Sequence, residues 1–241
     1  MIENYKFSFT NNRSERAYQV EHLVPALQDA NKRRELLMKI DVNNGEKISI
    51  TESDQSKIMH FVWVLRDAFY YERDLAFATK EWSSLISRWH NILILPDWAS
   101  NPIWWRHPNA EYKHKGDPEY VVHPCQQAVG WTKGAINKRV ERISHSTLTQ
   151  NDIGILTKTR EVMNTECDCL IQTPQRFIVV ECKYKTSFTK EQQARQKRLR
   201  ECLGRLLNRP YIYVEIANHP RTKRRHDQYW DWEMVPVEAE Q

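Results

Sequence analysis

The sequence predicts an α/β protein, with a mixed sheet flanked by helices and a mainly helical region at its N-terminal end. Two short apolar runs, at 167–171 and 177–182, are separated by the turn signal Gln172-Thr173-Pro174-Gln175 and predict an antiparallel hairpin. A helical pattern over 189–207 and a further apolar run over 211–216 follow them. In the first half of the chain, apolar residues recur instead at helical spacing.

The N-terminal region is expected to hold several helices. Residues 13–40 predict one or two of them around Pro25. An amphipathic helix capped by Ser53 is predicted by the spacing of Ile58, Phe61, Val62, Leu65 and Phe69. Another helix, starting near Thr79, places one apolar face on Trp82, Leu85, Ile86 and Trp89.

A proline-rich stretch divides the predicted domains. Residues 96–124 include five prolines and predict an irregular connection. We therefore expect a helical region over 1–100, a connection over 101–124 and an α/β core over 125–241. Within that core the predicted order is a helix at 125–144, strands at 153–156, 167–171 and 177–182, the helix at 189–207 and the strand at 211–216.

The composition narrows the class of protein. With 40% hydrophobic and 28% charged residues, the 241-residue chain can bury a core. It has no apolar run long enough to span a membrane and no apolar leader, so the expected location is cytoplasmic, without a membrane partner. The five cysteines follow no disulfide framework. Residues 1–123 carry a net charge of −1 and residues 124–241 carry +6, which favours a polyanionic partner for the second half.

The hairpin carries the residues most suggestive of chemistry. Residues two apart in a strand share a face, so Glu181 and Lys183 point to the same side, and the hairpin register can bring Asp168 alongside Glu181. The cysteines at 167, 169 and 182 then fall on the opposite, apolar face. Two carboxylates on neighbouring strands suit Mg²⁺ or Mn²⁺, and an adjacent lysine can act on the attacking water or on developing negative charge.

Asp168 followed by Glu181-Cys182-Lys183 resembles the PD-(D/E)XK nuclease superfamily, whose fold is restriction-endonuclease-like. The resemblance covers roughly residues 125–217 and implies a Mg²⁺-dependent phosphodiesterase, with Asp168 and Glu181 as metal ligands and Lys183 as a catalytic residue. It also implies a further acidic residue, for which Glu141 fits best and Glu161 and Glu166 compete. Gln192, on the helix that follows, is the expected additional site contact.

Nucleic acid is the expected partner, with DNA favoured over RNA and an endonuclease over an exonuclease. Basic residues for phosphate contacts occur on the helix and in a later loop: Arg195, Arg198, Arg221, Lys223, Arg224 and Arg225. The N-terminal region is expected to serve specificity, regulation or dimerisation, and a homodimer stays open as an option. Two alternatives also stay open: a non-catalytic nucleic-acid-binding module on the same fold, and a defence nuclease regulated by a partner.

Overall fold

The computed structural model describes residues 19–43, 46–100, 149–183, 189–217 and 228–231. These residues form a mixed α/β structure, as the sequence predicts. They divide into two compact units that interleave along the chain. Unit 1 comprises residues 1–62, 167–189 and 209–241, and unit 2 comprises 63–166 and 190–208. The two units therefore alternate in sequence rather than meeting at the predicted connection over 101–124, which lies outside the described residues.

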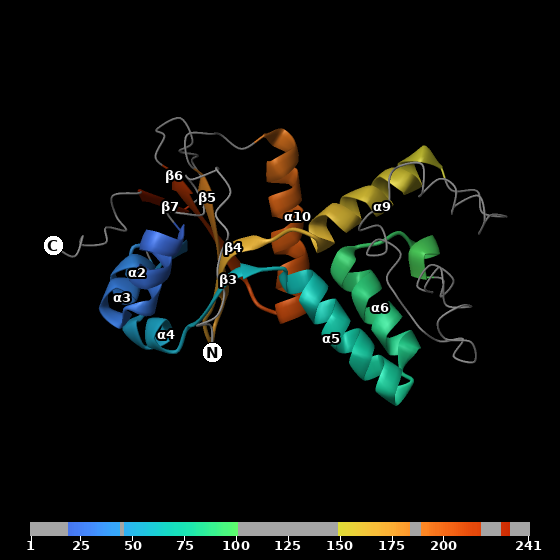
Figure 1. Ribbon diagram of the computed structural model, residues 1–241, viewed down its shortest axis with the longest axis horizontal. Coiled ribbons are helices and arrows are strands. Elements are labelled where there is room, and N and C mark those ends of the chain that lie inside the picture. Colours follow the sequence, from blue (N-terminus) through green and yellow to red (C-terminus); the bar gives the residue numbers. More distant parts are fainter. Residues whose placement is uncertain (1–18, 44–45, 101–148, 184–188, 218–227, 232–241) are drawn as a thin grey trace. The chain divides into compact units, whose positions relative to one another are not determined.

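Unit 1 is built on a five-stranded sheet with the order β3-β4-β5-β6-β7 (Figure 1). Its strands are β3 (Lys57–Val62), β4 (Cys167–Gln172), β5 (Phe177–Lys183), β6 (Tyr211–Ala217) and β7 (Gln228–Asp231). The β3–β4 and β4–β5 pairs are antiparallel, whereas β5–β6 and β6–β7 are parallel. The predicted hairpin at 167–171 and 177–182 and the predicted strand at 211–216 are thus confirmed.

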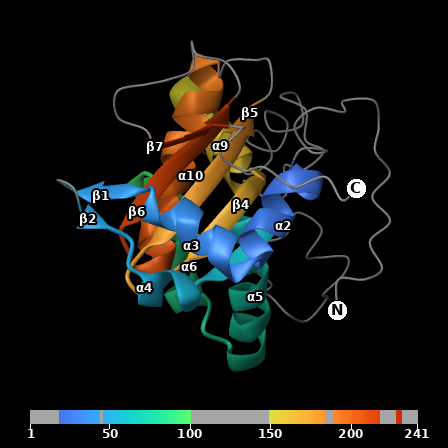
Figure 2. The same cartoon turned by 90° about the vertical axis from the view of Figure 1, so that its left-hand side faces the viewer.

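Short helices cover one face of this sheet. They are η1 (Gln19–Leu23), α2 (Val24–Gln28), with Pro25 in its first turn, and α3 (Ala30–Met38). Figure 2 shows α2 and α3 lying over the strands. Their leucines form one buried cluster with the inward residues of β4, β5 and β6, including Cys169, Val180, Cys182 and Val214. Branched and sulfur-containing side chains at alternate strand positions fill this layer, and their burial is the main stabilising contribution to unit 1.

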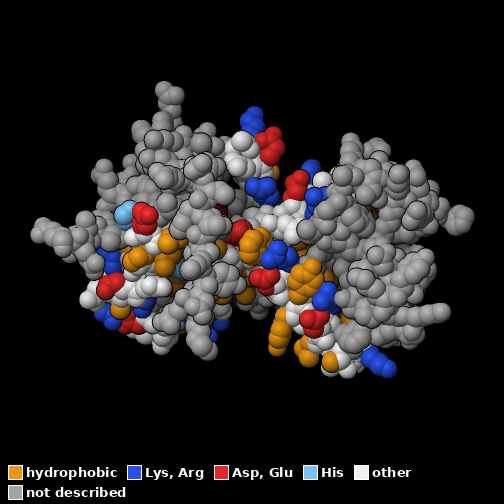
Figure 3. All heavy atoms as spheres, in the orientation of Figure 1, with side chains coloured by type: hydrophobic (Ala, Val, Ile, Leu, Met, Phe, Trp, Pro, Cys, Tyr) orange, Lys and Arg blue, Asp and Glu red, His pale blue; other side chains and the backbone are white. Residues whose placement is uncertain are grey.

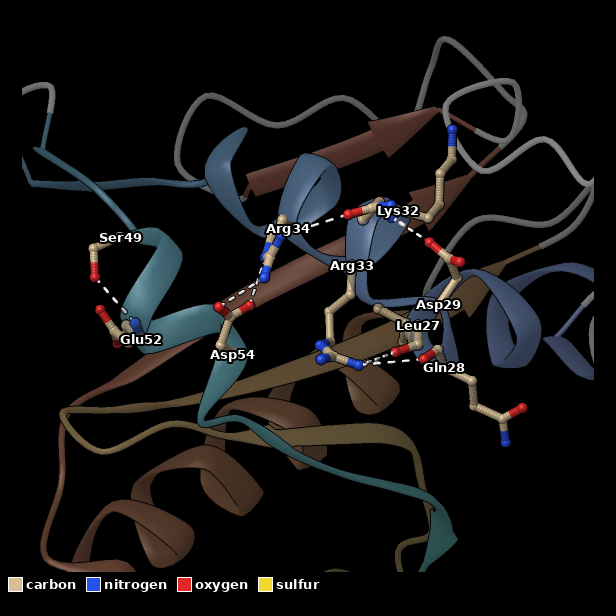
Figure 4. A network of polar contacts seen from close by, with 10 residues as sticks. Leu27, Gln28, Asp29, Lys32, Arg33, Arg34, Ser49, Glu52 and Asp54 are labelled. Atoms are coloured by element: carbon tan, nitrogen blue, oxygen red, sulfur yellow. Dashed lines mark hydrogen bonds and ion pairs between the residues drawn. The ribbon is translucent and has the colours of Figure 1, made fainter.

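Polar contacts stabilise α3 and α4 (Ile50–Asp54) and connect them within unit 1. Asp29 caps α3 by accepting a hydrogen bond from the Lys32 amide, and Ser49 caps α4 through the Glu52 amide at 3.1 Å (Figure 4). Arg34 forms a two-pronged ion pair with Asp54, with N–O distances of 2.6 and 2.8 Å. Between these helices, β1 (Asp41–Asn43) and β2 (Glu46–Lys47) form a small antiparallel pair.

Two predictions about this part of the chain are wrong. Residues 57–62 form the strand β3, not the start of a helix, and Ser53 lies inside α4 instead of capping a helix. The i, i+3, i+4 spacing that suggested one helix spans a strand and the first turns of the next helix. Pairing with β4 outweighs helix propensity in Lys57–Val62, where Ile58 and Val62 are β-branched.

The described residues of unit 2 include the helices α5 (Val64–Thr79), α6 (Trp82–Leu93), α9 (Gln150–Met163) and α10 (Lys190–Leu207), with the short η2 (Asp97–Ser100) after α6. The four apolar residues predicted to share a face of α6 are all buried, although the helix begins at Trp82. Trp89 packs edge-on against Phe69 of α5 and donates to the Glu72 carboxylate at 2.8 Å. The predicted helix over 189–207 is confirmed as α10.

Residues 153–156 were predicted to be a strand and instead lie within α9. The apolar run Ile153-Gly154-Ile155-Leu156 is one turn of a longer helix, because a four-residue run cannot by itself distinguish a strand from a buried helical turn. The third antiparallel strand of the sheet is supplied by β3, from the first 62 residues. The predicted helix at 125–144 lies outside the described residues. Among the described residues, no helix is both long enough and apolar enough to cross a membrane.

Candidate active site

The candidate site lies on the sheet face opposite the cysteine-lined core of unit 1. The β4–β5 register pairs Cys169 with Val180, so Asp168 and Glu181 occupy the next positions outward on neighbouring strands. Because Cys169 and Val180 belong to the core cluster, strand alternation directs Asp168 and Glu181 to the other face. The predicted separation of carboxylates from thiols on these two strands is therefore present.

The Asp168 side chain is fixed by the backbone of the next strand. Its Oδ2 accepts a hydrogen bond of 2.8 Å from the amide of Cys182, the middle residue of the Glu-X-Lys segment. A hydrogen bond from a backbone amide to a carboxylate is charge-assisted and stabilises the ionised form. Asp168 is therefore tied directly to the segment that contains Glu181 and Lys183. The Lys183 backbone completes β5, and its side chain is outside the described part of the structure.

A third carboxylate extends this row onto β6. The parallel β5–β6 register places Glu215 directly beside Glu181, and the exposed fractions of these residues are only 3% and 8%. Neighbouring strands lie roughly 4.8 Å apart, so the two carboxylates start from adjacent backbone positions on one face. Sequence reasoning identified the strand at 211–216 but did not single out Glu215. The signal was present, as one acidic residue inside an otherwise apolar and aromatic strand.

On the other side of Asp168, the edge strand is distorted. In β3, the paired residues His60 and Val62 face Cys169 and Cys167, which leaves Phe61 opposite Asp168. Phe61 has a φ of 53°, a left-handed backbone that bulky residues rarely adopt. Such strain persists only where the surrounding structure imposes it, and it is often found beside functional groups. The irregularity of β3 therefore falls in the same row as the three carboxylates.

Metal-ligating side chains are not fully assembled within the described residues. No group of three or more His, Cys, Asp or Glu side chains in that part of the chain is arranged to hold an ion. The carboxylate oxygens of Asp168 and Glu181 are nevertheless of the type that Mg²⁺ prefers, and Mg²⁺ commonly binds through one or two carboxylates while keeping several waters. The donor types fit the ion, and further ligands would have to come from water, from substrate or from residues outside the described ranges.

The remaining predicted site residues belong to unit 2 or lie outside the described residues. Gln192, Arg195 and Arg198 belong to α10, which is part of unit 2. The exposed Glu161 of α9 and the half-buried Glu166 that follows this helix belong to unit 2 as well. Arg198 is already engaged, because its Nη2 donates to Leu93 O at 3.3 Å and to Thr159 Oγ1 at 2.9 Å. Glu141 and the predicted basic loop residues Arg221, Lys223, Arg224 and Arg225 lie outside the described residues.

Unit 2 has an open pocket of its own, with a volume of about 620 Å³. The apolar residues Ile94, Leu95 and Pro96 after α6 form one wall, and Lys197 and Arg198 of α10 form another. Arg198 therefore both connects α10 to its neighbours in unit 2 and lines this pocket, together with Lys197 and Glu201.

Comparison with protein-family models, with curated proteins and with solved structures gives no match for this chain.

Proposed function

We propose that the protein is a metal-dependent nuclease of the PD-(D/E)XK kind that hydrolyses phosphodiester bonds, with DNA as the favoured substrate. The observation that carries the proposal is the hydrogen bond from the Cys182 amide to Asp168, which holds one carboxylate against the strand segment that bears Glu181 and Lys183. The strand order supports it too, because the Asp strand and the Glu-X-Lys strand are antiparallel neighbours and the next strand is parallel and follows a helix.

The roles of the residues follow from their chemistry. Asp168 and Glu181 would hold Mg²⁺ or Mn²⁺, and when bound the ion would lower the pKa of a coordinated water and neutralise charge on the phosphate. The Cys182 amide keeps the Asp168 oxygen oriented, which spares the site the entropy of ordering that side chain. Lys183 would orient the attacking water or stabilise the negative charge of the transition state.

Glu215 is the best additional acidic residue that the described structure offers to this site. It lies in register with Glu181 on the same face, whereas Glu161 is exposed on a helix of the other unit. We assign Glu215 the job of raising the affinity for the ion through coordinated water. Replacing it with glutamine should raise the Mg²⁺ concentration needed for half-maximal cleavage by about tenfold, while the rate at saturating Mg²⁺ stays closer to that of the wild type.

The direct test is a cleavage assay on a panel of substrates. The protein is incubated with supercoiled plasmid, linear duplex, single-stranded DNA and RNA, each in Mg²⁺, in Mn²⁺ and in EDTA. Cleavage of DNA in either metal, and none in EDTA, is the expected result. Metal-independent binding of DNA with no cleavage under any condition would instead favour a non-catalytic nucleic-acid-binding module.

A further inference from the structure

Helix α5 carries two apolar stripes, of which only one faces the interior of unit 2. The inner stripe comprises Leu65, Phe69 and Ala76, with exposed fractions of 1%, 0% and 6%. The second stripe repeats with alternating steps of four and three residues, the spacing of a coiled-coil seam. We call it the α5 seam, and it consists of Val64, Ala68, Tyr71, Leu75 and Ala78.

The centre of the α5 seam is open to solvent. Tyr71 is 73% exposed and Leu75 is 54% exposed, which makes them the two most exposed large hydrophobic residues in the described part of the chain. Because they are four residues apart on a helix, their side chains form one continuous ridge. Figure 3 shows hydrophobic side chains at the surface over α5, among charged ones. A contiguous apolar ridge rimmed by charge is typical of a protein interaction surface.

Along one flank of the α5 seam the charges are arranged so that carboxylates are outermost. Arg73 lies over the ring of Tyr70, with 4.6 Å between its guanidinium carbon and the ring centroid, and its side chain is only 14% exposed. Its partner Asp74, at 2.7 Å, is 68% exposed. The arginine is therefore folded back onto an aromatic ring, where it gains cation–π energy, and the carboxylate faces the solvent.

The same arrangement recurs seven residues earlier. Arg66 lies 4.3 Å from the ring centroid of Trp63 and is 29% exposed, while its partner Asp67 is 57% exposed. Asp67 and Asp74 are one heptad apart, so both lie along the same flank of the seam. The rim that a partner would meet on this side is acidic, although the chain as a whole carries +5.

We propose that the α5 seam is a docking site for an amphipathic helix of a partner protein, whose apolar face carries lysine or arginine along its flank. The acidic rim disfavours nucleic acid, which is a polyanion. It also disfavours an antiparallel pair of two copies of this chain, because that pairing would bring the carboxylates of one flank against those of the same flank in the partner. A basic-flanked helix satisfies both the apolar ridge and the charges beside it. This inference does not depend on nuclease activity.

The test uses designed peptides as probes of the full-length protein. One fluorescent helical peptide of about three heptads carries Leu at the seam positions and Lys along the flanks, and a matched peptide carries Glu in place of Lys. Fluorescence anisotropy at several salt concentrations should show binding of the Lys peptide that weakens as salt increases. Binding of the Glu peptide should be at least tenfold weaker. Equal binding of the two peptides, or no binding of the Lys peptide, would overturn the proposal.

Variants of the protein locate the binding surface. Replacing Tyr71 and Leu75 together with alanine should weaken binding at least tenfold, because truncation of central interface residues commonly costs that much. Asp67→Asn combined with Asp74→Asn should weaken it about fivefold. Ile50→Ala removes a residue of similar exposure, 51%, from unit 1 and should leave binding unchanged. Undiminished binding of the Lys peptide to the Tyr71/Leu75 variant would refute the assignment. Self-association of the wild-type protein that is abolished in this variant would refute it as well.

Discussion

A single backbone amide determines how the Asp168 carboxylate is presented. The Cys182 amide donates to this carboxylate, and hydrogen bonds to charged groups contribute about 1.5–3 kcal/mol each. This hydrogen bond joins the two half-motifs across 14 residues of sequence, so the geometry of the site depends on the β4–β5 register. A one-residue slip of that register would turn the cysteines outward and the carboxylates inward.

The cysteines give a direct test of this register. Cys167, Cys169 and Cys182 are fully buried, and burial raises the pKa of the Cys169 and Cys182 thiols well above the ordinary value. Burial also raises the pKa of Cys202 to about 11. Since the thiolate is the reactive form, these four residues should react with a thiol reagent at least a hundredfold more slowly in the native protein than in denaturant. Fast native labelling of Cys182, located by peptide mapping, would disprove the strand register.

His60 is expected to make the fold sensitive to acid. Both of its ring nitrogens are buried and have no hydrogen-bond partner among the described residues, and desolvation lowers its pKa below the ordinary 6.5. The unfolded chain therefore binds a proton more readily than the folded one, and this contribution destabilises the fold as the pH falls below about 6.5. Above that pH both states are neutral at His60 and the contribution vanishes.

Replacing His60 with leucine should accordingly make the melting temperature less dependent on pH. The difference in melting temperature between pH 7.5 and pH 5 should be smaller for His60→Leu than for the wild type, with the largest separation of the two proteins at pH 5. Identical pH profiles measured by calorimetry would show that His60 does not couple protonation to folding.

Strand alternation explains which site residues could be predicted from the sequence. The period of two placed Asp168 and Glu181 on the face opposite Cys169 and Cys182, and this needed no knowledge of other strands. Glu215 was missed because its proximity to Glu181 depends on a parallel pairing across an intervening helix. Such long-range register is not encoded in any local pattern, so the third carboxylate became apparent only in the folded sheet.

At the scale of elements, a buried polar cluster fastens the β4–β5 turn to α4. Glu52 accepts a hydrogen bond of 2.6 Å from Thr173 Oγ1 and forms an ion pair of 3.0 Å with Arg176 Nε. Glu52 and Arg176 are 5% and 8% exposed. Arg209, just before β6, donates to the Thr173 carbonyl and adds a third element to the cluster. The turn that sets the hairpin register is thus held by side chains from α4 and from the segment before β6.

Removing the Glu52 carboxylate should destabilise the protein strongly. Glu52→Ala leaves the Arg176 guanidinium buried without its main counter-ion and should lower the free energy of unfolding by about 3 kcal/mol. The neighbouring Glu46 is 59% exposed and lies 3.6 Å from Arg176, so Glu46→Gln is a matched control expected to cost less than about 1 kcal/mol. Urea denaturation measures both values, and a loss for Glu52→Ala no larger than that of the control would contradict this role.

Elements with a clear period were predictable, and those that depend on distant pairing were not. The helices α6 and α10 and the β4–β5 hairpin follow from local spacing and turn residues. Strand β3 was mistaken for a helix because its apolar residues happen to continue the spacing of α5, and only its pairing with β4 makes it a strand. The run at 153–156 was mistaken for a strand because four residues are too few to show the period of the helix that contains them.

At the scale of the whole molecule, the chain crosses between its two compact units several times. The sheet of unit 1 takes strands from the first 62 residues and from the segments after 167 and 209, while α10 belongs to unit 2. Composition could predict an α/β protein but not this interleaving, because contacts between distant segments leave no mark on local sequence. The candidate carboxylates Asp168, Glu181 and Glu215 all belong to unit 1, so the row they form does not depend on how the units are arranged.

The central claim is that Asp168 and Glu181 together support metal-dependent hydrolysis of phosphodiester bonds. The measurement that tests it most directly is the initial rate of plasmid cleavage in Mg²⁺ by the wild type, by Asp168→Asn, by Glu181→Gln and by the exposed control Glu46→Gln, with folding checked by circular dichroism. We predict that the first two variants remain folded and lose at least a thousandfold in rate, because each lacks a metal-binding charge, about 4 kcal/mol in transition-state stabilisation. The control should cleave like the wild type. Cleavage by Asp168→Asn and Glu181→Gln at the wild-type rate, or a wild type that cleaves equally well in EDTA, would contradict the account.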